Sequence, residues 1–163
     1  MLAFDGEVHV GQLQLRRHAP GTRSPNGLHD PLCWGDFGVH EPDVPDGAIA
    51  VYCYHVGQTD DTDARDGRYQ GRGIGVQLLD ALISWADEHG IPAIVAKAVP
   101  RFRPVKMFMG GQSAATYGSR GFATVASWID EELRTLVVRD GLAPEGVSLD
   151  EVARVSCCVR LRR

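Results

Sequence analysis

The sequence predicts a mixed α/β domain, and three neighbouring segments carry that prediction. Residues 49–56, Ile-Ala-Val-Tyr-Cys-Tyr-His-Val, are rich in β-branched and aromatic side chains, which is typical of a central strand. From Ile74 onwards apolar side chains recur at helical spacing, and Gly90 is placed to end that helix. The apolar run 93–99 then fits a parallel strand reached through the helix. We expect the whole chain, residues 1–163, to form a single domain around this unit.

The remaining elements are expected on either side of this unit. Residues 2–4 and 8–15 alternate apolar and polar side chains around an Asp-Gly turn, which predicts a hairpin. Residues 123–128 and 155–161 are predicted to be strands that pair antiparallel with each other. Between them, the amphipathic stretch 131–139 is expected to close the core with its apolar face, and a homodimer seam is the alternative.

Composition excludes several classes of protein. A net charge of −4 argues against a nucleic-acid-binding protein, because a basic patch supplies most of that affinity. The chain has no apolar run of about 18 residues, so no membrane span is expected, and its first residues lack the features of a secretion signal. Four cysteines without C-x-x-C or His-rich spacing predict no metal site and favour a reduced, cytoplasmic setting.

A glycine-rich segment stands where the long helix begins: Gln70, Gly71, Arg72, Gly73, Ile74 and Gly75. A helix start leaves about four backbone N–H groups without intrahelical partners and carries about half a positive charge, so it attracts anions such as a pyrophosphate. The spacing does not match a dinucleotide fingerprint, because the third glycine would fall at Val76 or Leu78. A Walker loop is also excluded, because no Lys-Ser/Thr pair follows the last glycine.

A second motif lies downstream at residues 113–122, Ser-Ala-Ala-Thr-Tyr-Gly-Ser-Arg-Gly-Phe. It is similar to an A-x-x-x-Y-x-x-x-G-F signature, and the earlier segment is similar to [QR]-x-x-G-x-[GA] before a long helix. Together the two motifs make the sequence resemble the GNAT superfamily of acyl-CoA-dependent N-acetyltransferases. The resemblance implies a fold in which the two central parallel strands splay apart, with the pantetheine arm of acetyl-CoA in the gap. Val56 would then offer its backbone to that arm, and residues 70–75 would hold the pyrophosphate.

The resemblance implies transfer of an acetyl or other short acyl group from acetyl-CoA to a primary amine, by direct attack in a ternary complex. Tyr117 would be the general acid that protonates the departing thiolate, although it could instead be a core aromatic residue. Cys53 lies in the middle of a predicted strand among apolar neighbours, which argues against a covalent cysteine intermediate. The alternative function is a non-catalytic module of the same fold that binds acyl-CoA. The acceptor is expected to be a small-molecule or peptide amine, and no metal is expected.

Such a transfer also needs a base for the amine proton, and Asp36, His40, Glu41 and His55 are all candidates. The sequence does not choose among them, and Glu41 is carried forward as the candidate base. In the superfamily a first strand and one or two helices normally precede the hairpin and form a wall of the acceptor site. The sequence does not contain them before the hairpin: either it is a shortened form, or the Pro- and Gly-rich segment 16–48 supplies the wall instead.

Two further differences from the superfamily pattern affect the residues expected to contact the coenzyme. Gly110 occupies the position where the superfamily often has an asparagine that contacts the coenzyme, and Gln112 or Ser113 could substitute for it. Three basic residues could reach the 3′-phosphate of the coenzyme, although the prolines around them predict a solvated loop: Arg101, Arg103 and Lys106.

Overall fold

A six-stranded mixed sheet organises the chain in the computed structural model, which describes residues 1–19, 37–59 and 64–162. The strands are β1 (Leu2–Asp5), β2 (Val8–Arg17), β3 (Ile49–Val56), β4 (Ala93–Ala98), β5 (Ala123–Ile129) and β6 (Arg154–Leu161). Their order across the sheet is β1-β2-β3-β4-β6-β5. Only the central pair, β3 and β4, is parallel, and every other neighbouring pair is antiparallel. The predicted mixed α/β fold class is therefore confirmed.

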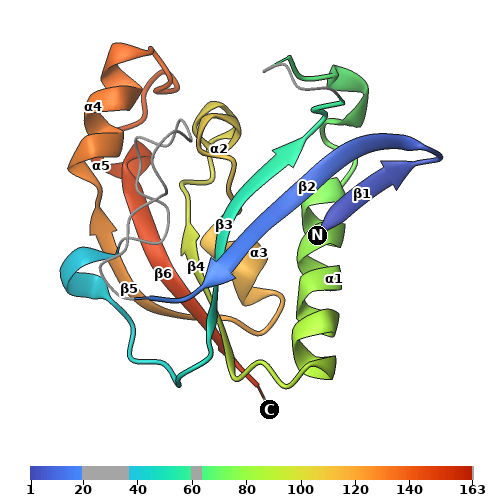
Figure 1. Ribbon diagram of the computed structural model, residues 1–163. Coiled ribbons are helices and arrows are strands. Elements are labelled where there is room, and N and C mark those ends of the chain that lie inside the picture. Colours follow the sequence, from blue (N-terminus) through green and yellow to red (C-terminus); the bar gives the residue numbers. More distant parts are fainter. Residues whose placement is uncertain (20–36, 60–63, 163) are drawn as a thin grey trace.

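Five helices connect the strands within the described ranges (Figure 1). They are α1 (Ile74–Glu88), α2 (Arg103–Met109), α3 (Ala114–Gly118), α4 (Glu131–Arg139) and α5 (Leu149–Val152), with single 3₁₀ turns η1 (Gly38–His40) and η2 (Gly67–Tyr69). Helix α2 corrects the expectation of a solvated loop, because its proline lies in the first turn, where a missing N–H costs no hydrogen bond. None of these helices is long and apolar enough to cross a membrane.

Helix α1 packs along one face of the sheet and fixes the glycine-rich segment at its start. Leu78, Leu79 and Leu82 point into a core that they share with β2, β3 and Tyr117 of α3. The spacing of these side chains is the apolar stripe that the sequence predicted. The helix ends as expected before Gly90, whose φ of +70° suits glycine.

The predicted amphipathic stretch 131–139 forms α4, which covers a second part of the core. Leu133 and Val137 are fully buried there with Val105 and Met109 of α2. This packing confirms that the apolar face of the stretch closes the core. It also places α2 firmly against the body of the protein, next to the divergent ends of β3 and β4.

Candidate functional site

The two parallel strands part because β3 carries a bulge. Gln14 of β2 pairs with Cys53, and the next residue, Leu15, pairs with Val51, so Tyr52 is an extra residue on β3. Bulges bend the strand that carries them and increase its twist. The pairing of β3 with β4 is confined to residues 49–51 of β3, and beyond it the two strands diverge (Figure 1).

The loop at residues 110–112 closes the inner end of this divergence. The N–H of Tyr54 donates to the carbonyl of Gly110 at 2.8 Å, and the N–H of Val99 donates to the carbonyl of Gln112 at 2.9 Å. Glycine is required here, because a Cβ at Gly110 would lie 2.8 Å from both Cys53 Sγ and the carbonyl oxygen of Tyr54. The loop thus takes the place of a short strand between β3 and β4, and the space further out stays open.

The glycine-rich segment lines that open space with exposed backbone. Gly71 and Gly73 have φ angles of +73° and +77°, a region that side chains with a Cβ avoid. No atom lies within 4 Å of the position of an added Cβ at either residue, so the backbone there is open to a ligand. Gly73 is the N-cap of α1 and supplies no side-chain hydrogen bond to the first turn. The positive end of a 15-residue helix is therefore available to an anion.

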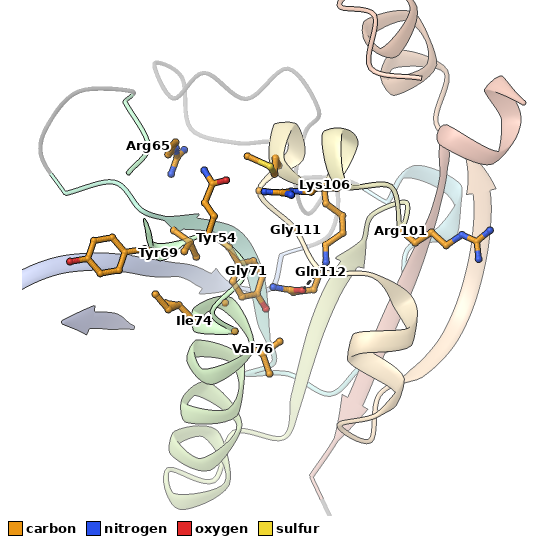
Figure 2. A pocket seen from close by; sticks show the side chains of 17 residues that line it. Tyr54, Arg65, Tyr69, Gly71, Ile74, Val76, Arg101, Lys106, Gly111 and Gln112 are labelled. Atoms are coloured by element: carbon orange, nitrogen blue, oxygen red, sulfur yellow. Dashed lines mark hydrogen bonds between the residues drawn. The ribbon is translucent and has the colours of Figure 1, made fainter. Parts of the chain in front are cut away.

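A cleft of about 440 Å³ runs from this helix start to the loop at residues 110–112 (Figure 2). Tyr54 and Val56 of β3 form one wall, and residues 70–76, with the exception of Arg72, form another. Four cationic residues also line it: Arg65, Arg101, Arg103 and Lys106. The cleft therefore combines a cradle of backbone N–H groups with side chains of positive charge, which suits a ligand carrying several phosphates.

Gln112 is a buried polar residue whose side chain reaches the start of α1. Its side-chain nitrogen would lie 2.6 Å from a Cβ at Gly75, and its oxygen accepts a hydrogen bond of 3.5 Å from Lys106 Nζ. Figure 2 shows Lys106 reaching from α2 towards this amide. Ser113 is engaged as the N-cap of α3, since its Oγ accepts from the N–H of Thr116. Of the two substitutes proposed for the missing asparagine, Gln112 is thus the one that lines the cleft.

Tyr117 lies behind the cleft and not on its wall. Its side chain is fully buried, with 1% of the residue exposed, and its hydroxyl lies 3.3 Å from the hydroxyl of Tyr54. Tyr54 does line the cleft. Burial raises the pKa of both phenols above the usual value of about 10, and for Tyr117 the nearby Tyr54 raises it further. The role of Tyr117 as the general acid stays a prediction.

The candidate bases lie in different places. Glu41 follows η1 and its Oε1 lies 3.1 Å from Nε2 of His18, whose side chain is 5% exposed, away from the cleft-lining residues. His40 stacks on Trp128 of β5, with ring centroids 4.6 Å apart. His55 has its Nδ1 3.0 Å from Nη2 of Arg65, at the margin of the cleft. Asp36 lies outside the described residues.

Most of the residues that the sequence predicts to contact the coenzyme lie close together in the structure. Val56 and the glycine-rich segment line one cleft, although Arg72 instead extends over the ring of Tyr69, 5.9 Å from its centroid. The sequence analysis missed Tyr54 as a wall of the site. Strict alternation of side chains along β3 would not place Tyr54 on this wall, and the bulge that does so cannot be recognised from the sequence of β3. Among the described residues, no three His, Cys, Asp or Glu side chains gather in a way that could hold a metal ion.

Comparison with known proteins agrees with this geometry. Residues 64–108 match the model of the Acetyltransferase (GNAT) family. A Bacillus subtilis acetyltransferase solved in complex with CoA aligns with a TM-score of 0.52 and 14% identity, over 99% of this chain and 75% of that one. The GNAT-like decarboxylase GphF, solved with isobutyryl-CoA, aligns with a TM-score of 0.52 and 17% identity, over 99% and 77%.

A Streptococcus pneumoniae acetyltransferase of the GNAT family also matches at 15% identity, with a TM-score of 0.49 and 99% of this chain covered. This chain spans only 65% of the length of that protein. Comparison with curated proteins finds no significant match. The family segment includes the glycine-rich motif and the start of α1, and the sheet has the GNAT fold. The resemblance to the GNAT superfamily noted from the sequence is thereby confirmed.

Proposed function

We propose that this protein with the GNAT fold is an acyltransferase that moves an acetyl or other short acyl group from coenzyme A to a primary amine. The observation that carries the proposal is the open backbone of Gly71 and Gly73 at the start of α1, inside a cleft that leads to the divergent strands. The match of residues 64–108 to the GNAT acetyltransferase family supports it.

The phosphates, the pantetheine arm and the thioester of an acyl-CoA each have a suitable partner in the cleft. The N–H groups of the glycine-rich segment suit the pyrophosphate, because no side chain blocks their approach. Arg65, Arg103 and Lys106 suit the remaining negative charge of the phosphates. The pantetheine arm then extends along β3, where Val56 offers its backbone, and brings the thioester towards Tyr54. Neighbours of the same fold were solved with CoA and with isobutyryl-CoA, which supports this choice of ligand.

The proposed reaction is direct attack of the neutral amine on the thioester carbonyl carbon. The C–S bond then breaks and its electron pair stays on sulfur. The nitrogen loses one proton and the sulfur gains one, directly or through water, so that the amide and free coenzyme A are released. Holding both reactants in one cleft supplies much of the acceleration. We do not assign the base to Glu41, because its carboxylate contacts His18 and is not among the cleft-lining groups.

Two other functions are compatible with the same cleft. A non-catalytic acyl-CoA-binding module would bind the coenzyme and release no thiol. A decarboxylase would remove CO₂ from a carboxylated acyl-CoA and leave the thioester intact, and one neighbour of this fold is described as a GNAT-like decarboxylase. Amine acetylation is preferred because the family segment is that of acetyltransferases.

Binding is tested by calorimetry of acetyl-CoA with the full chain and two charge-matched variants. Gly73→Asp places a side chain and a negative charge in the cradle and should weaken binding at least about tenfold, since it opposes the helix dipole and the phosphates. Gly146→Asp is the control, because its φ of +75° and open surroundings match those of Gly73 outside the cleft. Equal affinities for both variants would place the coenzyme elsewhere.

Activity is tested by thiol release from acetyl-CoA with a panel of amines. The proposal predicts thiol release that depends on one class of amine, together with the acetylated product by mass spectrometry. Binding without thiol release from any amine would support the non-catalytic module. Loss of CO₂ from malonyl-CoA without thiol release would instead support the decarboxylase.

A further inference from the structure

Tyr54 separates the cleft from the tyrosine that the sequence motif points to. Its ring lies at the start of α1, where Cδ1 is 3.7 Å from the position of a Cβ on Gly75. On its other side, its hydroxyl lies 3.3 Å from the hydroxyl of Tyr117. Tyr54 lines the cleft and Tyr117 does not. A group that enters the cleft along β3 therefore meets Tyr54 first.

The bulge at Tyr52 is what brings Tyr54 to this position. Ile49 and Val51 face the core beneath α1, and unbroken alternation would direct Cys53 to that side next. The extra residue shifts the alternation by one, so that Tyr54 joins this core beside Tyr117. Its N–H is fixed at the same time by the carbonyl of Gly110 at 2.8 Å. Tyr54 is thus fixed at both ends, by a hydrogen bond from its backbone N–H and by the contact of its hydroxyl with Tyr117.

Both tyrosines are largely buried, with 6% of Tyr54 and 1% of Tyr117 exposed, and of the two only Tyr54 lines the cleft. A phenol has one proton to donate and also accepts. If Tyr117 donates its proton to the oxygen of Tyr54, the proton of Tyr54 remains for a group in the cleft. The reverse arrangement would direct the proton of Tyr54 into the core, where Tyr117 is 1% exposed. A ligand that develops negative charge in the cleft favours the first arrangement.

We propose that Tyr54 is the catalytic hydroxyl that donates a hydrogen bond to the leaving sulfur, and that Tyr117 is a positioning residue behind it. This inference rests on the proposed acyl transfer. As the C–S bond breaks, its electron pair moves to sulfur and the hydrogen bond from Tyr54 stabilises the thiolate. The nitrogen that has attacked gives up one proton and the thiolate gains one, directly or through water, so that Tyr54 keeps its own proton throughout.

The test compares Tyr54→Phe, Tyr117→Phe and the double variant, with acetyl-CoA and the best amine of the panel. Tyr54→Phe should lower kcat about 100-fold and leave KM for acetyl-CoA within about twofold. Removing a single hydrogen-bond donor to a developing negative charge has an effect of this size on kcat in other enzymes. Tyr117→Phe should lower kcat less, by about tenfold, because Tyr54 is still present but less well oriented. The double variant should be no slower than Tyr54→Phe, because Tyr117 acts through Tyr54.

The outcomes separate this inference from the proposed function. If Tyr54→Phe keeps the parent kcat while Tyr117→Phe loses it, Tyr117 reaches the sulfur itself and the inference is wrong, although acyl transfer stands. If the kcat of the double variant falls by the product of the two single losses, Tyr117 does not act through Tyr54 and its positioning role is wrong. If the folded parent binds acetyl-CoA but acylates no amine, the proposed function fails and this inference fails with it. Thermal unfolding and acetyl-CoA calorimetry of each variant identify any loss that comes from misfolding.

Discussion

Lys97 of the central strand β4 and Asp130 form a buried ion pair, with Nζ 2.7 Å from Oδ2 and with 4% and 11% of their side chains exposed. Asp130 has a second role, because its Oδ1 accepts from the N–H of Leu133 as the N-cap of α4. One carboxylate therefore joins the middle of the sheet to the helix that closes the second part of the core.

Asp130→Asn should lower the free energy of unfolding by about 3 kcal/mol, because it leaves the Lys97 ammonium buried beside a neutral group. Asparagine is as good an N-cap as aspartate, so the capping hydrogen bond is retained and the loss reports the charge. Urea unfolding at pH 7 measures the effect. Glu131→Gln removes the same charge from the adjacent, exposed ion pair with Arg134 and should cost less than about 1 kcal/mol. Equal costs would mean that the buried pair contributes no more than the exposed one.

Gly110→Ala should destabilise the protein by at least about 2 kcal/mol more than Gly141→Ala. Both glycines have similar φ angles, +58° and +62°, so alanine carries about the same backbone strain at each, about 1–2 kcal/mol. A Cβ at Gly141 meets no atom within 4 Å, whereas at Gly110 it meets the backbone oxygen of Tyr54 at 2.8 Å. Backbone cannot move aside cheaply in a packed core. The urea midpoints of the two variants, compared at an unchanged dependence of the unfolding free energy on urea, measure the difference. Equal losses of stability would show that the loop relaxes away from β3.

Tyr54→Phe should cost more stability than Tyr117→Phe, whatever reaction the protein catalyses. The first change leaves the hydroxyl of Tyr117 in the core without the partner at 3.3 Å, which costs about 1–3 kcal/mol. The second leaves the hydroxyl of Tyr54, a residue that is 6% exposed and lines the cleft, so we expect water from the cleft to replace the lost partner. The double variant leaves neither hydroxyl behind and should cost less than the sum of the single changes. Chemical denaturation of all three completes the cycle, and strict additivity would mean that the two hydroxyls do not interact.

The sequence was most informative where local pattern and packing agree. Residues 49–56 form β3 and the helix begins at Ile74, both as predicted, because their apolar spacing is the spacing of the buried face. The glycine-rich segment could also be located from the sequence, because the positive φ angles at Gly71 and Gly73 require glycine at those positions whatever the rest of the fold.

The parts that the sequence did not reveal depend on contacts between distant segments. The bulge at Tyr52 exists only in the pairing of β3 with β2, so it could not be seen in β3 alone. The burial of Tyr117 behind Tyr54 depends on that bulge and on the packing of α3. Helix α2 was missed because the prolines near Arg103 suggested a loop, whereas Pro104 lies in the first turn of the helix and Val105 and Met109 bury its inner face.

His18 should make the free energy of unfolding depend on pH, and the charges and burial around it decide whether acid stabilises or destabilises the fold. Burial lowers the pKa of His18, the nearby Glu41 opposes that shift, and Arg16 adds to it. Because the folded pKa lies below the unfolded value of about 6.5, the unfolded chain binds the proton more readily, and stability falls as the pH drops through that value. His18→Gln should therefore reduce the stability lost between pH 7.5 and 5.5, measured by urea unfolding at each pH. Glu41→Gln should increase that loss, since it removes the group that favours the protonated ring. A parent whose stability rises on acidification, or two variants that change the loss in the same direction, would contradict this account.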